Sequence, residues 1–294
     1  MVKTSLFAWE KYRYIVVINL LSKKFSKEVN AIEKDSTHGA TFLTLSLLEA
    51  LAQELIKNEV NFDELNLIIS RLNNIHPEMT SIHRSLEKIA SKIKDDFSSE
   101  KAIEIILNEI KSVNEREMKT AKNLAEKISH FKRIMILSSS LTIDSALIDF
   151  KKELNIEEII VLESRPLYEG RNTAKKLMKV GYQVTLIIDA AAGFVARNVE
   201  AIILGADTIF SDGAVLNKVG SFNLALIADY YKIPLIVGAS TNKQSKSPSI
   251  NYFNLIEEKN PKEIWKNTKN KIKRYNFYFD LIPVTYITEI VSEK

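Results

Sequence analysis

The spacing of apolar residues changes near residue 130 of this 294-residue chain. Before that point they recur every three or four positions, which is the period of one face of an α-helix; examples are Leu43, Leu47, Leu48, Leu51 and Leu55. After it they form short runs separated by helix-like stretches. The change predicts a helical domain over residues 1–128 and a second domain over residues 129–294.

Five short apolar runs in the second half predict β-strands. They lie at residues 133–137, 158–162, 183–188, 201–204 and 234–237. The helix-like patterns between them give the alternation that is typical of a doubly wound parallel sheet. The predicted fold class is therefore α/β, an N-terminal helical domain followed by a Rossmann-like sheet. Such sheets bind ligands where the carboxyl ends of neighbouring strands meet.

Composition excludes several kinds of chemistry. The chain has no cysteine, and none of its four histidines is paired at metal-ligand spacing, so we expect no disulfide, no catalytic thiol, no metal and no cofactor. A net charge of +4 does not by itself imply nucleic-acid binding. No apolar run reaches the roughly 18 residues of a membrane span, and the N-terminus lacks a signal-peptide pattern. We expect a cytoplasmic protein without membrane contact.

Polar side chains follow the ends of the predicted strands. Ser138, Ser139, Ser140 and Thr142 come after the first strand, at the start of a predicted helix. Hydroxyls and free backbone amides at a helix N-terminus suit a phosphate or another anion. An ordinary helix cap explains the same residues equally well.

Charged and amide side chains follow the later strands. Arg165 stands two positions after Glu163, so the two residues either pair with each other or hold a ligand. Asp207, Asn217 and Lys218 come after the fourth strand. Lys neutralises phosphate, and Asp and Asn bond hydroxyls, which indicates a phosphorylated polyol, although these residues are also common in turns.

The order of these motifs resembles a known family. It unites the alpha, beta and delta regulatory subunits of translation initiation factor 2B with the isomerases of methylthioribose 1-phosphate and of ribose 1,5-bisphosphate. The resemblance covers about residues 131–290 and is carried by ESRPLYEGR, VTLIIDAAAG, ILGADTIFSDGAVLNKVGS, IPLIVGAS and NFYFDLIPVTYITEI. DSTHGATFLTLSLLEAL and HPEMTSI match more loosely. The resemblance implies a helical N-terminal domain and a Rossmann-like domain that forms most of a homodimer.

The resemblance also assigns roles to single residues. The family's isomerases are thought to transfer a proton with an Asp and a Cys, and to grip the phosphorylated sugar with Arg and Asn-Lys groups. In this sequence Asp207 matches the Asp, and Arg165, Asn217 and Lys218 match the gripping groups. Asp280, in the last apolar run, either shapes the pocket, by resemblance, or caps a turn.

Two departures from the isomerases argue against catalysis. Ser138 stands at the Cys position, or Ser139 or Ser140 does if the register shifts. A hydroxyl has a far higher pKa than a thiol, whose pKa is about 8.5, and is poorly matched to proton transfer near neutral pH. His38, followed by Gly39, stands where the isomerases carry Arg before Gly, and it lacks the guanidinium fork.

We therefore expect a regulatory-subunit-like protein related to initiation factor 2B. It would bind a sugar phosphate or nucleotide without converting it, and would not be an enzyme. The alternative is an active aldose–ketose isomerase in which Asp207 works with a water or another side chain.

A lysine-rich segment near the C-terminus is the candidate surface for a macromolecular partner. It contains Lys259, Lys262, Lys266, Lys269, Lys271, Lys273 and Arg274, with Trp265 and Tyr275 among them. Such a segment suits RNA, or an acidic partner such as the initiation factor 2 alpha subunit. A solvated basic face explains it as well.

Overall fold

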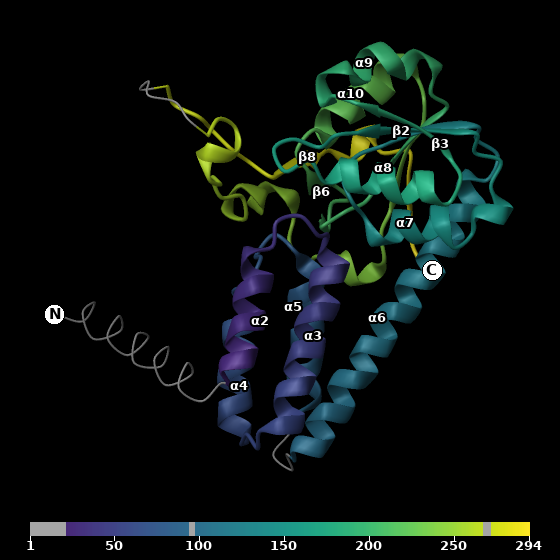
Figure 1. Ribbon diagram of the computed structural model, residues 1–294. Helices are drawn as coiled ribbons and strands as arrows, with labels where there is room; N and C mark the ends of the chain where they lie inside the picture. Colours follow the sequence, from purple (N-terminus) through teal and green to yellow (C-terminus); the bar gives the residue numbers. More distant parts are fainter. Residues whose placement is uncertain (1–21, 94–97, 267–271) are drawn as a thin grey trace. The chain divides into compact units, whose positions relative to one another are not determined.

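The computed structural model describes residues 22–93, 98–266 and 272–294 (Figure 1). Its chain forms two compact units. The first contains the chain up to Asp35, Thr41–Pro77 and Ile82–Val113, and the second contains Ser36–Ala40, Glu78–Ser81 and Asn114–Lys294. The division falls within helix α6 (Ser99–Ile128), whereas the predicted boundary lies at the C-terminal end of that helix.

The first unit is helical. It is built from α2 (Lys23–Lys34), α3 (Ala40–Lys57), α4 (Phe62–Leu72), α5 (Thr80–Lys92) and the first half of α6. Its interior is filled by the leucines and isoleucines whose spacing predicted helices, among them Leu43, Leu51, Leu86 and Ile106. Removing such side chains from water supplies the main favourable term for folding this unit.

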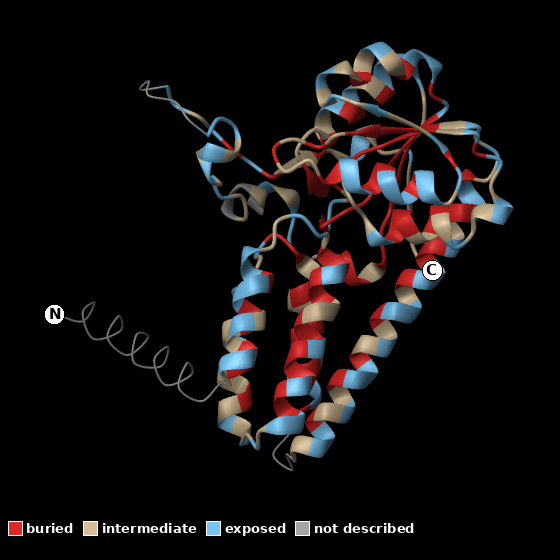
Figure 2. Cartoon of the chain, viewed as in Figure 1, coloured by how far each residue is buried: buried red, intermediate tan, exposed pale blue. Residues whose placement is uncertain are grey.

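The second unit is built on a six-stranded parallel sheet in the order β3-β2-β1-β4-β7-β9. The strands are β1 (Arg133–Ile136), β2 (Glu158–Leu162), β3 (Gln183–Ile187), β4 (Ala201–Leu204), β7 (Leu235–Gly238) and β9 (Glu289–Val291). The central strands are buried on both faces, as Figure 2 shows in red, which is why they read as continuous apolar runs in the sequence.

Helices cover both faces of this sheet. Side chains of α6, α7 (Leu141–Ile148) and α8 (Glu169–Lys179) form one buried cluster with the strands. Side chains of α9 (Ala192–Val195) and α10 (Ser221–Tyr231) form the other. The predicted fold class, a helical region followed by a doubly wound parallel sheet, is therefore confirmed.

A small antiparallel sheet was not predicted. It consists of β5 (Thr208–Ile209), β6 (Val215–Lys218) and β8 (Phe279–Ile282), in that order. Its pairing places Asn217 opposite Asp280 and Lys218 opposite Phe279. Two candidate ligand groups thus stand on a strand and not in a turn. Short 3₁₀ segments lie at Lys151–Glu153, Asp189–Ala191, Ala196–Asn198, Thr241–Lys243, Ser249–Asn254, Pro261–Glu263 and Val284–Tyr286.

Candidate functional site

The strand order places a topological switch point beside β1. From β1 the chain continues on one side to β2 and β3, and later on the other side to β4, β7 and β9. Ligands of open parallel sheets bind outside the carboxyl ends of the strands at such a switch point. The loop after β1 and the loop after β4 meet there, because a Cβ at Gly205 would lie 2.8 Å from the Ser140 Oγ. Only glycine allows this approach.

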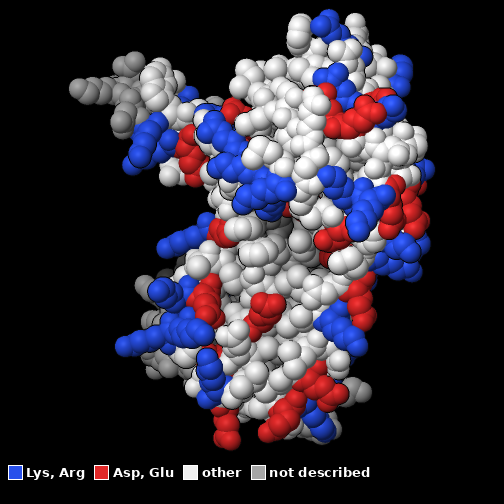
Figure 3. Space-filling model, turned by 45° about the vertical axis from the view of Figure 1, so that its right-hand side comes forward, with Lys and Arg blue, Asp and Glu red and all other residues white. Residues whose placement is uncertain are grey.

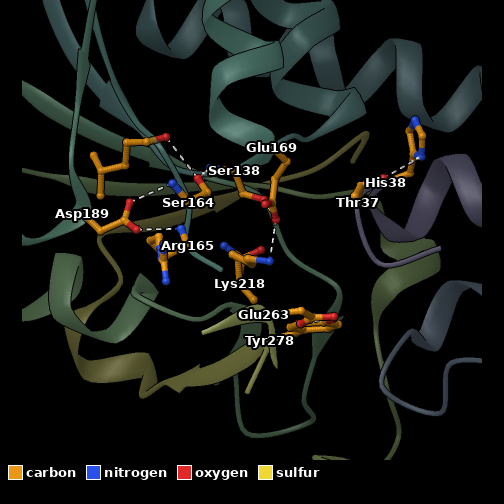
Figure 4. A network of polar contacts seen from close by, with 12 residues as sticks. Thr37, His38, Ser138, Ser164, Arg165, Glu169, Asp189, Lys218, Glu263 and Tyr278 are labelled. Carbon is orange, nitrogen blue, oxygen red and sulfur yellow. Dashed lines mark hydrogen bonds and ion pairs between the residues drawn. The ribbon is translucent and has the colours of Figure 1, made fainter. Parts of the chain in front are cut away.

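Ser138, Glu169 and Lys218 form a connected polar cluster at these strand ends (Figure 4). The Ser138 hydroxyl donates to Glu169 Oε1 at 3.2 Å, and the Lys218 ammonium pairs with the same oxygen at 2.5 Å. The Glu169 and Lys218 side chains are only 4% and 7% exposed. The second carboxylate oxygen, Glu169 Oε2, is buried without a hydrogen-bond partner among the described residues.

Asp207, at the end of β4, is a buried carboxyl with a strongly perturbed pKa. Its burial, chiefly, and the nearby Glu78 raise the pKa to about 6, against the opposing effects of Lys243, the Ala40 amide and Lys218. The Ser36–Ala40 and Glu78–Ser81 segments belong to the same unit as the sheet. Asp207 is therefore able to hold or release a proton close to neutral pH.

The loops after β1 and β2 contain residues in an uncommon backbone conformation. Ser138, Ser164 and Tyr168 have φ angles of 69°, 64° and 62°, a region that non-glycine residues seldom adopt. The Asp189 carboxylate accepts the Ser164 and Arg165 amides at 2.8 and 2.7 Å. The Ser138 amide donates to the Ser164 hydroxyl at 2.8 Å. Strain of this kind clusters at functional sites and persists where surrounding bonds enforce it.

Arg165 does not pair with Glu163, one of its two predicted roles. Its guanidinium donates to the Tyr168 hydroxyl and, at 3.2 Å, to the Ile264 carbonyl. Glu163 pairs instead with Arg171 at 2.9 Å. The Arg165 side chain extends across Tyr168, with its guanidinium carbon 4.9 Å from the ring centre.

Several predicted ligand groups are engaged within the protein. The Ser140 hydroxyl caps α7 by accepting the Ile143 amide. Thr142 is fully buried and donates to Glu117 at 2.6 Å. The Asn217 amide donates to the Ser221 hydroxyl at 2.9 Å. Through these bonds the three side chains position the loops at the strand ends.

The segment that contains His38 and Gly39 reaches the site by its backbone. A Cβ at Gly39 would lie 3.3 Å from the Ser139 carbonyl oxygen, so this segment packs against the loop after β1. The exposed His38 ring is 3.4 Å from the Thr37 hydroxyl and lies apart from the Ser138 cluster in Figure 4.

Asp280 caps α10 from a distant strand. Its carboxylate accepts the Gly220 amide at 2.8 Å and the Phe222 amide at 3.3 Å. Burial raises its pKa to about 6 in spite of these bonds. The bonds hold the start of α10 beside β8, on which Asp280 lies, whereas the two predicted roles were to shape the pocket or to cap a turn.

Sequence reasoning missed Glu169, Glu78 and Lys243. Glu169 precedes Gly170 at the start of α8 and looks like an ordinary acidic residue of a first helical turn. Glu78 lies in the loosely matching HPEMTSI segment. Lys243 follows the strand β7, and the strand-end rule that identified Asp207 would have found it.

The lysine-rich segment is only partly described, because Lys269 and Lys271 lie outside the described residues. Lys259 pairs with Glu257 at 3.3 Å, and the Arg274 guanidinium donates to the Trp265 carbonyl at 2.7 Å. On the face seen in Figure 3 acidic side chains are interspersed among the basic ones.

Residues 22–93, 98–266 and 272–294 contain neither a cluster of metal-binding side chains nor a membrane-spanning helix. Three or more His, Cys, Asp or Glu side chains nowhere gather there in a way that could hold a metal ion. No helix within those ranges is long and apolar enough to cross a membrane.

Comparison with known families and proteins gives consistent matches. The Initiation factor 2 subunit family matches residues 36–294. The ribose 1,5-bisphosphate isomerase of Archaeoglobus fulgidus is 37% identical over 138 residues, which are 46% of this chain and 44% of that protein. The methylthioribose-1-phosphate isomerase of Geobacillus kaustophilus is 29% identical over 289 residues, which are 90% of this chain and 81% of that protein. The first of these matches thus spans less than half of the relative.

Among solved structures, the translation initiation factor eIF-2B of Pyrococcus horikoshii has a TM-score of 0.81 at 24% identity. The match covers 93% of this chain and 96% of that one. At this identity the likeness shows the shared fold alone.

These relatives correct the predicted function. A non-catalytic regulatory subunit was expected because of Ser138, but the curated relatives of this chain are named as isomerases, including one that matches along 90% of it. The expectations that the protein lacks turnover and is not an enzyme are therefore wrong. The physical reason for the error is that Ser138 was judged as an isolated hydroxyl, whereas the fold bonds it to the Glu169 carboxylate.

Proposed function

Because the chain belongs to the Initiation factor 2 subunit family, we propose that it is an aldose–ketose isomerase for a pentose phosphorylated at C1. The observation that carries the proposal is the buried Asp207 carboxyl, with a pKa of about 6, at the carboxyl end of β4. A group that titrates there can both give and take protons near neutral pH.

The reaction needs such a group because a phosphate on C1 locks the sugar as a ring. Opening the ring requires a proton on the ring oxygen as the bond from C1 to that oxygen breaks. A proton must then leave C2, another must reach C1, and the C2 hydroxyl must lose its proton to become the ketone. In our proposal Asp207 protonates the ring oxygen and later accepts the hydroxyl proton, which regenerates it.

Cationic side chains beside Asp207 would hold the phosphate. Lys243 and Lys218 both act electrostatically on Asp207, so a phosphate near them would also be near the proton donor. Arg165 and the loop of Ser139 and Ser140 are further predicted contacts, because guanidinium groups and backbone amides favour phosphate oxygens. Contacts from His38, Gly39, Thr142 and Asn217 also stay predictions.

The direct test is conversion of ribose 1,5-bisphosphate and of methylthioribose 1-phosphate by the purified full chain, followed by NMR detection of the ketose. Asp207→Asn should reduce the rate by about 10²–10⁴-fold, the usual contribution of a general acid–base group. Asp229→Asn is the matched control, because this Asp is 57% exposed and pairs only with Lys232 at the surface. Failure of the wild-type chain to convert either sugar would refute the proposed function.

We also propose that two copies of the chain pair through the face formed by β3, α9 and α10. Helices α9 and α10, and Ile188 directly after the edge strand β3, expose large apolar side chains: Ile188 (60%), Phe194 (71%), Leu226 (42%) and Tyr230 (79%). Helices α9 and α10 adjoin, because the Tyr231 hydroxyl donates to the Gly193 carbonyl at 3.0 Å. An apolar patch next to a sheet edge marks an interaction site, and solved structures that share this fold include an oligomeric complex.

Light scattering after size-exclusion chromatography tests this pairing. We expect a dimer for the wild-type chain and a monomer for Ile188→Asp, because burying an unpaired carboxylate in an apolar interface is costly. Ile56→Asp is the control, since Ile56 is similarly exposed, at 62%, in the helical unit. An unchanged dimer for Ile188→Asp would place the interface elsewhere.

Binding of RNA or of the initiation factor 2 alpha subunit by the lysine-rich segment stays a prediction. If RNA binds, its affinity should fall steeply as salt rises, because phosphate contacts release counterions. Titration of a labelled RNA at two salt concentrations would check this.

A further inference from the structure

The contacts around Glu169 lack a purely structural explanation. A buried carboxylate normally has both oxygens satisfied, but Glu169 has its Ser138 and Lys218 contacts on Oε1. Its Oε2 is buried and unpartnered within the described part of the chain. Leaving a buried polar atom unpaired is costly, and such atoms concentrate where a protein needs them for chemistry.

We propose that Ser138 and Glu169 form a proton relay that supplies the second proton-transfer group of the isomerase, in addition to Asp207. This inference rests on the proposed function. A serine hydroxyl is a weak base by itself but becomes effective when a neighbouring base accepts its proton. Here that base is in place, 3.2 Å away and buried.

The relay accounts for the steps that Asp207 does not perform. After the ring opens, the Ser138 oxygen takes the proton from C2 while its own proton passes to Glu169 Oε1, and the electron pair of the C2–H bond forms the C1–C2 double bond of an enol. Ser138 then gives a proton to C1 while Glu169 returns its proton to Ser138. The C2 hydroxyl loses its proton to Asp207. All groups end in their starting states, and no further reactant is needed.

Lys218 connects this relay to the substrate. While Glu169 is charged, the Lys218 ammonium is paired with it at 2.5 Å. When Glu169 takes the proton from Ser138, that pairing weakens. The buried Lys218 ammonium then attracts the oxygen or phosphate of the bound sugar more strongly. An interaction of this kind appears only as charge moves, which is the condition for stabilising a transition state.

The backbone fixes the geometry of the relay. Ser138 is held at φ 69°, its amide donates to the Ser164 hydroxyl, and its carbonyl accepts the Thr173 hydroxyl at 3.0 Å. Thr173 and Glu169 both lie on α8. Ser138 is therefore tied to the helix that carries its proton acceptor.

A double-mutant cycle tests the relay, with ribose 1,5-bisphosphate and methylthioribose 1-phosphate as probes. The readout is the rate of ketose formation. We expect Ser138→Ala and Glu169→Gln each to reduce it by about 100-fold or more. Glu157→Gln, the same change at an exposed carboxylate that pairs with Lys132, is expected to keep the wild-type rate within about twofold, as for substitutions outside the machinery.

The discriminating measurement is Glu169→Gln in a Ser138→Cys background. A thiol ionises near pH 8.5 and does not need a neighbouring carboxylate to accept its proton. In the Ser138→Cys background, Glu169→Gln should therefore reduce the rate of ketose formation by less than about tenfold. An equal cost in both backgrounds would mean that Glu169 is only structural, and would overturn the relay.

The remaining outcomes are also decisive. Removing Glu169 leaves the Lys218 charge unpaired, so circular dichroism must show that the variant is folded. If it is not, Ser138→Ala carries the test, and a rate within tenfold of wild type for that variant overturns the relay. If the wild-type chain converts neither sugar, the proposed function and the relay are both refuted, and no variant is needed to show it.

Discussion

Asp207 destabilises the folded chain at neutral pH, and its replacement by Asn should therefore stabilise the protein. The Asp207 carboxyl is 8% exposed, and its ordinary pKa of 3.8 is raised to about 6, mainly by burial. Burial disfavours the charged form, and Asn has nearly the same shape but cannot ionise.

The raised pKa fixes the sign and the size of the effect. Between pH 3.8 and about 6 the folded chain keeps a proton that the unfolded chain has lost, so stability falls as pH rises through this window. Below the window both states are protonated, and above it the whole penalty is present. At about 1.4 kcal/mol per pH unit, the penalty is about 3 kcal/mol. Asp207→Asn should recover most of it at neutral pH.

Urea denaturation of both proteins at about pH 5 and about pH 8 measures the difference. The gain of the variant should be clear at the higher pH and smaller at the lower one. Asp229→Asn should show no such dependence, because the Asp229 side chain is 57% exposed and pairs with Lys232 at the surface. A variant that is less stable than the wild type at pH 8 would refute the reasoning, since the carboxylate would then be net stabilising where it is buried.

The kcat/KM of the wild-type chain should fall as pH rises above about 6, because Asp207 loses the proton that it must give to the ring oxygen, and a flat pH–rate profile would contradict this role. Gly170→Ala should lower the thermal stability of the chain by about 1–3 kcal/mol, because its Cβ would lie 1.8 Å from the Leu162 carbonyl oxygen. Gly193→Ala is the control in the same thermal unfolding experiment. It should be neutral or stabilising, because the nearest neighbour of its Cβ would be Ile227 at 3.9 Å. Asp280→Ala should cost about 0.5–2 kcal/mol at about pH 4, where the carboxyl still caps α10 but the ionisation penalty implied by its raised pKa is absent, and a melting temperature equal to that of the wild type at this pH would show that the cap contributes nothing.

The main sheet was predictable because its strands are buried on both faces. The predicted runs at residues 133–137, 158–162 and 201–204 match β1, β2 and β4 to within a residue. By contrast, β5 and β9 have two and three residues, too few to show a period. Strand β6 ends in Asn217 and Lys218, which read as a turn, and its partner β8 comes from far along the chain.

The candidate site was predictable only in part, for a related reason. Strand-end position led to Asp207, but its pKa depends on Lys243 and Glu78, which no local pattern links to it. The positions of Ser140 and Thr142 in the sequence are typical of an anion-binding loop. In the fold, however, the Ser140 hydroxyl caps α7 and the Thr142 hydroxyl donates to Glu117. A hydrogen-bonding group has a few competing partners, and only the tertiary structure decides among them.

The same argument explains why the missing thiol was misleading. Judged by its own pKa, Ser138 is a poor proton-transfer group, and the absence of cysteine from the chain indicated a loss of catalysis. The reactivity of a hydroxyl, however, is set by the group that accepts its proton. The fold places the Glu169 carboxylate at that point, shields it from water and pairs it with a buried Lys. A serine at position 138 therefore needs the Glu169 carboxylate to accept its proton, whereas a cysteine would not. The loss of rate caused by Glu169→Gln, measured with serine and with cysteine at position 138, tests this difference directly.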